Sequence, residues 1–208
     1  KDPIKELGES CGLTVEETIQ KLTRKYDGYH FSKRLRDIFN PFSILNCFSS
    51  LDFADYWFAS GTPTYLMRLM SDNDVNVNEL TGKEYDASEF VDYKATKQKP
   101  LPMLYQSGYL TIKGYDAELN VYRLDFPNEE VRSGLVSMLA SDYFKPDNGS
   151  DSWLVDFTRC LRKGDIEQFK LQLTALLSNI SYRFQRKADE RECERHFQYT
   201  FYLIMLLL

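Results

Sequence analysis

The chain has 208 residues, a formal net charge of −5, 43% hydrophobic residues and 27% charged residues. This length suits one domain or two small ones, and the composition excludes a disordered or fibrous protein. The negative charge argues against a protein that binds nucleic acid mainly by electrostatic attraction. Two local basic stretches, residues 21–36 and 183–187, are most simply solvated charged faces.

The cysteines and the apolar segments indicate the cellular compartment of the protein and whether it binds a metal or a membrane. The four cysteines are widely spaced with no CxxC pair, which indicates reduced thiols and predicts a cytoplasmic protein. Cys193 and His196 lie one helical turn apart, but two ligands do not make a zinc site, so we predict no bound metal. The apolar run 201–208 is far shorter than the about 20 residues that span a bilayer, and we predict no membrane partner.

The first strong helix signal is the TVEE sequence at residues 14–17, which forms a capping box. Apolar residues follow it at helical spacing, and the helix is expected to continue to Tyr26. Gly28 suits a left-handed residue at the helix C-terminus, so we predict that the helix stops there.

Two further helix starts place a proline in the first turn. The Asn-Pro pair at 40–41 predicts a helix over residues 41–51, and the Gly-Thr-Pro sequence at 61–63 predicts a second, short one. Residues 71–100 are polar and show no clear periodicity. We expect a loop there with one or two weak elements.

Residues 100–124 predict a winged-helix-like module. The segment PLPMLYQSG at 100–108 is typical of a short helix that ends at a glycine. Residues 109–113 and 120–124 then alternate apolar and polar side chains, which predicts a β-hairpin whose turn contains Gly114 and Asp116. A short helix followed directly by such a hairpin is the pattern of a winged helix.

After residue 126 the sequence predicts only helices. Asn128 is expected to cap a helix whose first turn carries two glutamates, which complement the helix dipole. Further helices are expected over 153–164 and 165–180, and from about residue 188 to the end. We therefore predict a mainly α protein with a boundary near residue 126. Residues 1–126 would contain helices and a small β-hairpin, and residues 127–208 only helices.

Common catalytic motifs are absent from the sequence. None of the ten glycines belongs to a GxxxxGK[ST] phosphate loop, and GxGxxG, GxSxG and HExxH do not occur. Asp92 and Lys94 form a DxK triplet in a polar stretch, which we reject as a metal-dependent nuclease core. His30 lies in the aromatic-rich sequence KYDGYHF, where it is either a catalytic partner of Asp27 or a structural neighbour of aromatic rings.

Five blocks of the sequence, in this order, resemble a known family. They are YDGYHF (26–31), FNPFSILNCF (39–48), DYWFASGTPTYL (55–66), LYQSGYLTIKGYD (104–116) and YRLDFPNEEVR (122–132). The family is one of bacterial AAA-ATPase-like proteins, abundant in Bacteroidetes and Clostridia. Its members begin with a P-loop ATPase domain and end with a PD-(D/E)XK nuclease-like domain. The resemblance covers nearly the whole chain.

The resemblance implies that residues 1–126 form a helical lid and a winged-helix-like module after the ATPase core. Residues 127–208 would be the helical start of the nuclease-like domain. The phosphate-binding loop would then precede residue 1, and the nuclease carboxylates and lysine would follow residue 208. The chain would be a middle segment without activity of its own. ATP and Mg²⁺ are implied for the parent protein, and no cofactor is expected in this chain.

The resemblance also implies which partners the segment has. They are the ATPase and nuclease-like domains of the same parent protein, and a second copy could pair through the apolar C-terminal helix. The predicted function is regulatory: the segment would couple the ATP state to the C-terminal domain. The alternative is a winged-helix module that binds nucleic acid or protein, although its presumed recognition stretch, 102–108, contains no basic residue.

Candidate site residues follow from the same resemblance. One set holds the family-motif positions, at a corner of the lid that would face the nucleotide or the ATPase core: Tyr26, Asp27, Gly28, Tyr29, His30, Asn40, Pro41, Gly61, Thr62 and Pro63. Glu194 is a candidate catalytic carboxylate, because nucleases of this class often place an acidic residue on the helix before the sheet. Glu190 and Glu192 are rivals for that role, and a solvated helix face is the simpler interpretation.

Overall fold

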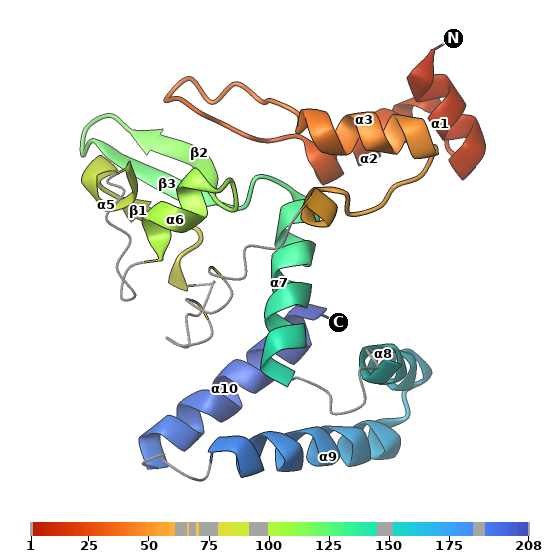
Figure 1. Cartoon of the computed structure of the whole chain (residues 1–208), viewed down its shortest axis with the longest axis vertical. Coiled ribbons are helices and arrows are strands. Elements are labelled where there is room, and N and C mark those ends of the chain that lie inside the picture. Colours follow the sequence, from red (N-terminus) through yellow and green to blue (C-terminus); the bar gives the residue numbers. More distant parts are fainter. Residues whose placement is uncertain are drawn as a thin grey trace. The chain divides into compact units, whose positions relative to one another are not determined.

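The computed structural model describes residues 2–60, 66, 70, 79–91, 100–144, 152–184 and 190–207. It confirms a mainly helical protein, which also contains a small antiparallel sheet of three strands (Figure 1). The chain divides into two compact units, Lys1–Leu135 and Val136–Leu208. The division falls inside helix α7 (Glu129–Phe144), whereas the boundary predicted near residue 126 precedes that helix.

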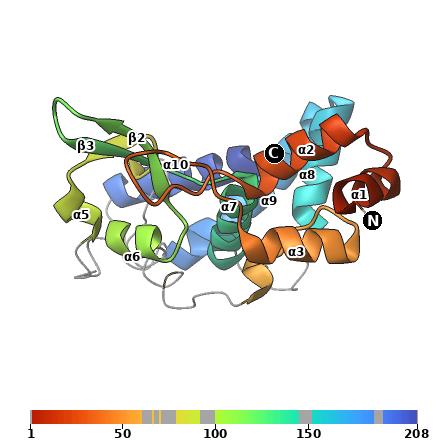
Figure 2. The ribbon, with the colours of Figure 1, turned by 90° about the horizontal axis from the view of Figure 1, so that it is seen from above.

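Three helices build the N-terminal part of the first unit: α1 (Pro3–Cys11), α2 (Val15–Tyr26) and α3 (Pro41–Ser50). They lie side by side in both views (Figures 1 and 2). Their shared core contains four buried side chains, those of Leu7, Leu22, Tyr26 and Cys47. Partly buried apolar residues pack around this core, so burial of apolar surface holds the three helices together.

The predicted ends of α2 and α3 are confirmed. Thr14 and Glu17 exchange both hydrogen bonds of the capping box at the start of α2. Asn40 accepts backbone hydrogen bonds from the first turn of α3, which opens with Pro41. Helix α2 ends just before Gly28, whose φ of +90° is readily adopted only by glycine.

The rest of the first unit is built around the sheet. The elements are β1 (Lys83–Tyr85), α5 (Ala87–Val91), α6 (Leu101–Gln106), β2 (Thr111–Asp116) and β3 (Val121–Asp125). All strands are antiparallel in the order β1-β3-β2 (Figure 1). The hairpin of β2 and β3 confirms the prediction. Strand β1 was not predicted, because its three residues are too few to show an alternating pattern.

The turn of this hairpin differs from the prediction. Gly114 lies inside β2, where the pairing register shifts between Ile112 and Gly114, and it marks a bulge as interior strand glycines often do. The chain reverses between β2 and β3, over residues 117–120. The Asp116 carboxylate accepts backbone hydrogen bonds from Glu118 and Leu119, so the aspartate opens the turn by binding its own backbone.

The second unit contains the C-terminal part of α7 and the helices α8 (Ser152–Lys163), α9 (Ile166–Phe184) and α10 (Glu190–Leu207). These elements agree with the helices predicted after residue 126. The rings of Phe157 and Phe169 meet edge to face at 5.2 Å and join α8 to α9. Among the helices in the described ranges, none is both long and apolar enough to cross a membrane.

Candidate functional site

Residues Asp27–His30, which we call the corner, form hydrogen bonds with segments far away in the sequence. Asn128 Nδ2 donates to the carbonyl oxygen of Asp27 at 2.9 Å, across 101 residues of sequence. Lys113 Nζ donates to the carbonyl oxygen of Gly28 at 2.7 Å. The His30 backbone binds Thr111 across 81 residues. The corner therefore joins the end of α2 to strand β2 and to the start of α7.

His30 is buried and its polar groups contact the protein. Its Nδ1 lies 2.6 Å from the carbonyl oxygen of Ile112, and its Nε2 lies 2.7 Å from Asp37 Oδ1. Its backbone N–H donates to Thr111 Oγ1, and that hydroxyl donates to the His30 carbonyl oxygen, both at 2.8 Å. The Asp27 carboxylate instead accepts the N–H of Gly28. Both ring nitrogens are thus used in contacts: Nδ1 holds the imidazole against β2, and Nε2 contacts the Asp37 carboxylate.

Thr111→Val is expected to destabilise the chain by about 1–3 kcal/mol, because it keeps the side-chain shape but leaves a buried N–H and C=O of His30 without their partner. Urea unfolding followed by circular dichroism measures this loss. Thr111→Ser retains the hydroxyl and is expected to be much less destabilising. If Thr111→Val is no less stable than Thr111→Ser, the hydrogen bonds of the hydroxyl contribute little to stability at this position.

Lys113 connects the corner to the loop that precedes α7. Its ammonium donates to the carbonyl oxygens of Gly28 and Pro127, at 2.7 and 2.8 Å. Burial lowers the pKa of Lys113, and the negative charges of nearby aspartates, including Asp125, oppose that shift. A Cβ at Gly28 would lie 2.4 Å from the carbonyl oxygen of Pro127 and 2.7 Å from Lys113 Nζ, so these contacts require glycine there.

Glu130 forms a second junction at the start of α7. This carboxylate is fully buried, and its Oε2 accepts from Ser43 Oγ at 2.7 Å. Its Oε1 accepts from the backbone N–H groups of Tyr56 and Trp57 at 2.7 and 3.0 Å. Burial raises the pKa of Glu130, and the three hydrogen bonds oppose that rise. The carboxylate joins α3, the segment before the helical turn η1 (Trp57–Ser60), and α7.

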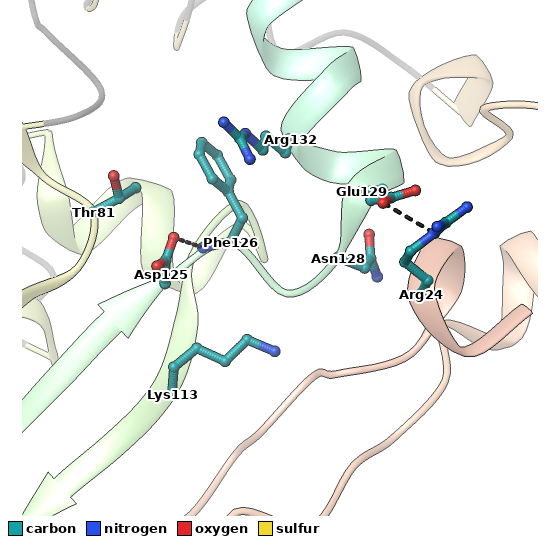
Figure 3. Close-up of a pocket in the computed structure, with 8 residues that line it drawn as sticks. All are labelled: Arg24, Thr81, Lys113, Asp125, Phe126, Asn128, Glu129 and Arg132. Carbon is teal, nitrogen blue, oxygen red and sulfur yellow. Dashed lines mark hydrogen bonds and ion pairs between the residues drawn. The ribbon is translucent and has the colours of Figure 1, made fainter. Parts of the chain in front are cut away.

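A cavity of about 500 Å³ lies beside the corner, at the loop between β3 and α7 (Figure 3). Its lining combines three cations, two carboxylates, two neutral polar side chains and one aromatic ring: Arg24, Lys113, Arg132, Asp125, Glu129, Thr81, Asn128 and Phe126. Arg24 Nε pairs with Glu129 Oε1 at 3.1 Å, and Asp125 Oδ1 accepts the N–H of Phe126. We call this cavity the loop pocket. Its lining carries more positive than negative side chains, which favours an anionic occupant.

The other predicted site residues of the first unit lie around the corner. Tyr26 is buried in the helical core, and Tyr29 is buried with its ring stacked on Phe31 at a centroid distance of 6.2 Å. Asn40 donates its N–H to the carbonyl oxygen of Tyr26 and caps α3, which begins at Pro41. The positions of Gly61, Thr62 and Pro63 lie outside the described residues.

Glu194, the predicted carboxylate of the second unit, is an exposed residue of α10. It accepts a hydrogen bond from Gln198 Nε2, one helical turn away, at 3.3 Å. Over the ranges that the structure describes, no group of three or more His, Cys, Asp or Glu side chains could hold a metal ion. Glu194 therefore has the contacts of a residue on a solvated helix face.

Sequence reasoning missed the two side chains that join the corner and the helices most directly. It placed Lys113 only at the end of a predicted hairpin strand, and it interpreted Glu130 only as a charge that complements a helix dipole. Both residues lie inside the blocks that carry the family resemblance, 104–116 and 122–132. Their position in these blocks was the available signal, but nothing local indicates which oxygens or N–H groups they bind.

The comparisons with known proteins give one informative similarity. No family model matches the chain, and no solved structure matches it. The chain is 25% identical over 180 residues to a protein of Azotobacter chroococcum described as an uncharacterised protein in the vnfD 5′ region. The similarity covers 85% of this chain and 34% of that protein. The chain thus spans about a third of the length of the curated relative that it matches.

Proposed function

We propose that this chain is a non-catalytic coupling segment of a longer AAA-ATPase-like protein, in which it transmits the nucleotide state to a C-terminal nuclease-like domain. The observation that carries the proposal is the corner. Asp27, Gly28 and His30 bind the start of α7 and β2, at positions 81 to 101 residues away in sequence. A displacement of any one of these elements would have to move or break the hydrogen bonds to the others.

The contacts of the corner suit transmission better than catalysis. Asp27, Gly28 and His30 use their polar groups to bind the protein itself. The same geometry would make the corner sensitive to a movement of α2, because its first residue, Asp27, is the C-terminal cap of that helix. The similarity to a protein about two and a half times as long also fits a segment within a larger architecture.

In the parent protein, ATP and Mg²⁺ would bind to the ATPase domain, and this chain would contribute neither the phosphate loop nor a metal site. Its own contribution would be mechanical: α2 and the corner would respond to the ATPase domain. The hairpin and α7 would carry the response onward. Localisation in the cytoplasm is part of this proposal, since the chain would work beside a nucleotide-dependent domain.

Asp27→Ala in the longer protein is expected to weaken nucleotide binding or its coupling, because the Asp27 carboxylate accepts the N–H of Gly28 and shapes the corner. Hydrogen–deuterium exchange with and without ATP measures the effect. In the unaltered protein, ATP should change exchange in the peptides that contain residues 26–30, 111–113 and 127–132 together.

The matched control is Asp52→Ala, which also removes a carboxylate that accepts the next residue's N–H, but at an exposed position away from the corner. It should leave the response to ATP intact. The proposal is wrong if ATP changes exchange at the corner without any change at residues 111–113 and 127–132. An ATPase or nuclease activity of the purified 208-residue chain would also contradict it.

The alternative function, a winged-helix module that binds nucleic acid, has one specific observation in its favour. The elements follow the order β1, α5, α6, β2, β3 with β3 in the centre of the sheet, which is the order of a winged helix. Beside the hairpin, Lys33 donates to Tyr115 Oη at 2.9 Å, and the exposed Arg34 and Arg36 follow it. Binding of duplex DNA that weakens steeply with salt, and that is lost in an Arg34→Gln, Arg36→Gln variant, would favour this alternative.

A further inference from the structure

We propose that the loop pocket binds the phosphate group of a small phosphorylated molecule, and that Arg132 is its main contact. The argument starts from the charges of the pocket, which contains three cations and two carboxylates. The site lies within the first unit and does not depend on the coupling role proposed above. A chain that binds no phosphate could still transmit a displacement through the corner.

Two of the three cations already have partners. Arg24 pairs with Glu129 through its Nε, and Lys113 donates to the carbonyl oxygens of Gly28 and Pro127. The guanidinium of Arg132, by contrast, has no hydrogen-bond or ion-pair partner among the residues that the structure describes. Its planar set of donors matches the oxygens of a phosphate. Arg132 is therefore the cation that remains available to a ligand.

The partnered cations would still contribute to the site. An ammonium has three donors, and the two carbonyl oxygens occupy only two of those of Lys113. Burial lowers the pKa of Lys113, so a nearby anion would favour its charged form. Arg24 uses Nε for Glu129 and retains two further nitrogens on the same guanidinium. A phosphate in the pocket would thus meet positively charged donors from three different elements, α2, β2 and α7.

The size and composition of the pocket indicate an organic phosphate ester. A volume of about 500 Å³ is within the usual range for small-molecule sites and exceeds the space that one phosphate group needs. The ring of Phe126 and the polar groups of Thr81 and Asn128 could contact the organic part (Figure 3). A phosphate ester also presents three strong acceptor oxygens, one more than a carboxylate, to the donors of the three cations.

The test is a titration of the ¹⁵N-labelled chain with inorganic phosphate and with AMP, at constant ionic strength, followed by amide chemical shifts. Both probes should cause saturable shifts in the segments 24–28 and 125–132. Arg132→Gln should weaken AMP binding about tenfold or more, as expected when a charge-assisted hydrogen bond is lost. Since Arg132 is exposed and its guanidinium unpartnered, this variant should fold normally, which its own spectrum reports.

The matched control is Arg162→Gln, which removes the same charge from an exposed position that does not line the pocket. It should leave AMP binding within about twofold of the original, since screened charges outside the site contribute little. Equal weakening by both variants would overturn the proposal, because it would indicate a general charge effect. Adenosine producing the same shifts as AMP, or acetate the same shifts as phosphate, would also overturn it. So would the absence of saturable shifts with either phosphate probe.

Discussion

Glu130→Ala is expected to lower the free energy of unfolding by about 3–5 kcal/mol, the order of magnitude reached when several buried donors lose their acceptor and a cavity is opened. The substitution leaves the N–H groups of Tyr56 and Trp57 and the hydroxyl of Ser43 without their shared acceptor. It also opens a cavity where a fully buried side chain was. Urea unfolding of the purified chain measures the loss.

Glu130→Gln is the matched control, because it keeps the side-chain volume and one carbonyl oxygen. That oxygen can accept from Tyr56 and Trp57, while the new amide can donate to Ser43 Oγ. We expect a loss of less than about 1.5 kcal/mol, typical of one altered hydrogen bond. If the alanine variant is as stable as the glutamine variant, Glu130 does not join these segments.

A comparison of the wild type with Glu130→Gln also predicts the sign of the pH dependence of the unfolding free energy. Burial raises the pKa of Glu130 above its ordinary value of 4.5. The unfolded chain therefore loses this proton at a lower pH than the folded chain does. The contribution of Glu130 to stability is fully present below the unfolded pKa and declines as pH rises through the folded pKa. The difference in unfolding free energy between wild type and Glu130→Gln should shift in favour of the variant over that interval, and a constant difference would contradict it.

Local sequence signals predicted the helices well because the interactions that start a helix are made between residues close in sequence. The capping box at Thr14 and the Asn40–Pro41 start involve hydrogen bonds within one turn, so the sequence contains all the participants. The same holds for Asn128, whose Oδ1 accepts the N–H of Val131 in the first turn of α7. The hairpin was predictable from its alternation, whereas its exact turn was not, because Gly114 serves a bulge.

The site could not be predicted in the same way, because its contacts are made across long sequence separations. The bond from Lys113 to Gly28 spans 85 residues, and the bond from Glu130 to Ser43 spans 87. Nothing within either local sequence indicates the partner. The resemblance blocks pointed to the right neighbourhoods, yet they assigned importance to His30 and Asp27 by motif. The structure shows that the oxygens and N–H groups of the backbone carry most of the contacts at the corner.

The second substitution with a large expected effect on stability is at Gly28, within the sequence KYDGYHF. Gly28→Ala is expected to destabilise the chain by about 2–4 kcal/mol, the sum of backbone strain at φ +90° and of steric overlap in a packed site. The new methyl group would lie 2.4 Å from the carbonyl oxygen of Pro127, and backbone cannot move aside as a flexible side chain can. Relief of that overlap has to separate Gly28 from the 127–128 loop, and so break the bonds made by Lys113.

Gly12→Ala separates these two causes. Gly12 also has a positive φ, of +67°, but a Cβ there would meet nothing within 4 Å. The control variant is therefore expected to lose only the free energy of a left-handed backbone conformation, about 1 kcal/mol. Amide hydrogen exchange then locates the damage: Gly28→Ala should speed exchange at residues 111–113 and 128–132, and Gly12→Ala should not. If the two variants lose equal stability and their exchange at those residues is alike, the contacts of the corner are not what glycine protects at position 28. A larger loss at Gly28, with faster exchange on both β2 and α7, is the result expected of a junction that joins both elements through one residue.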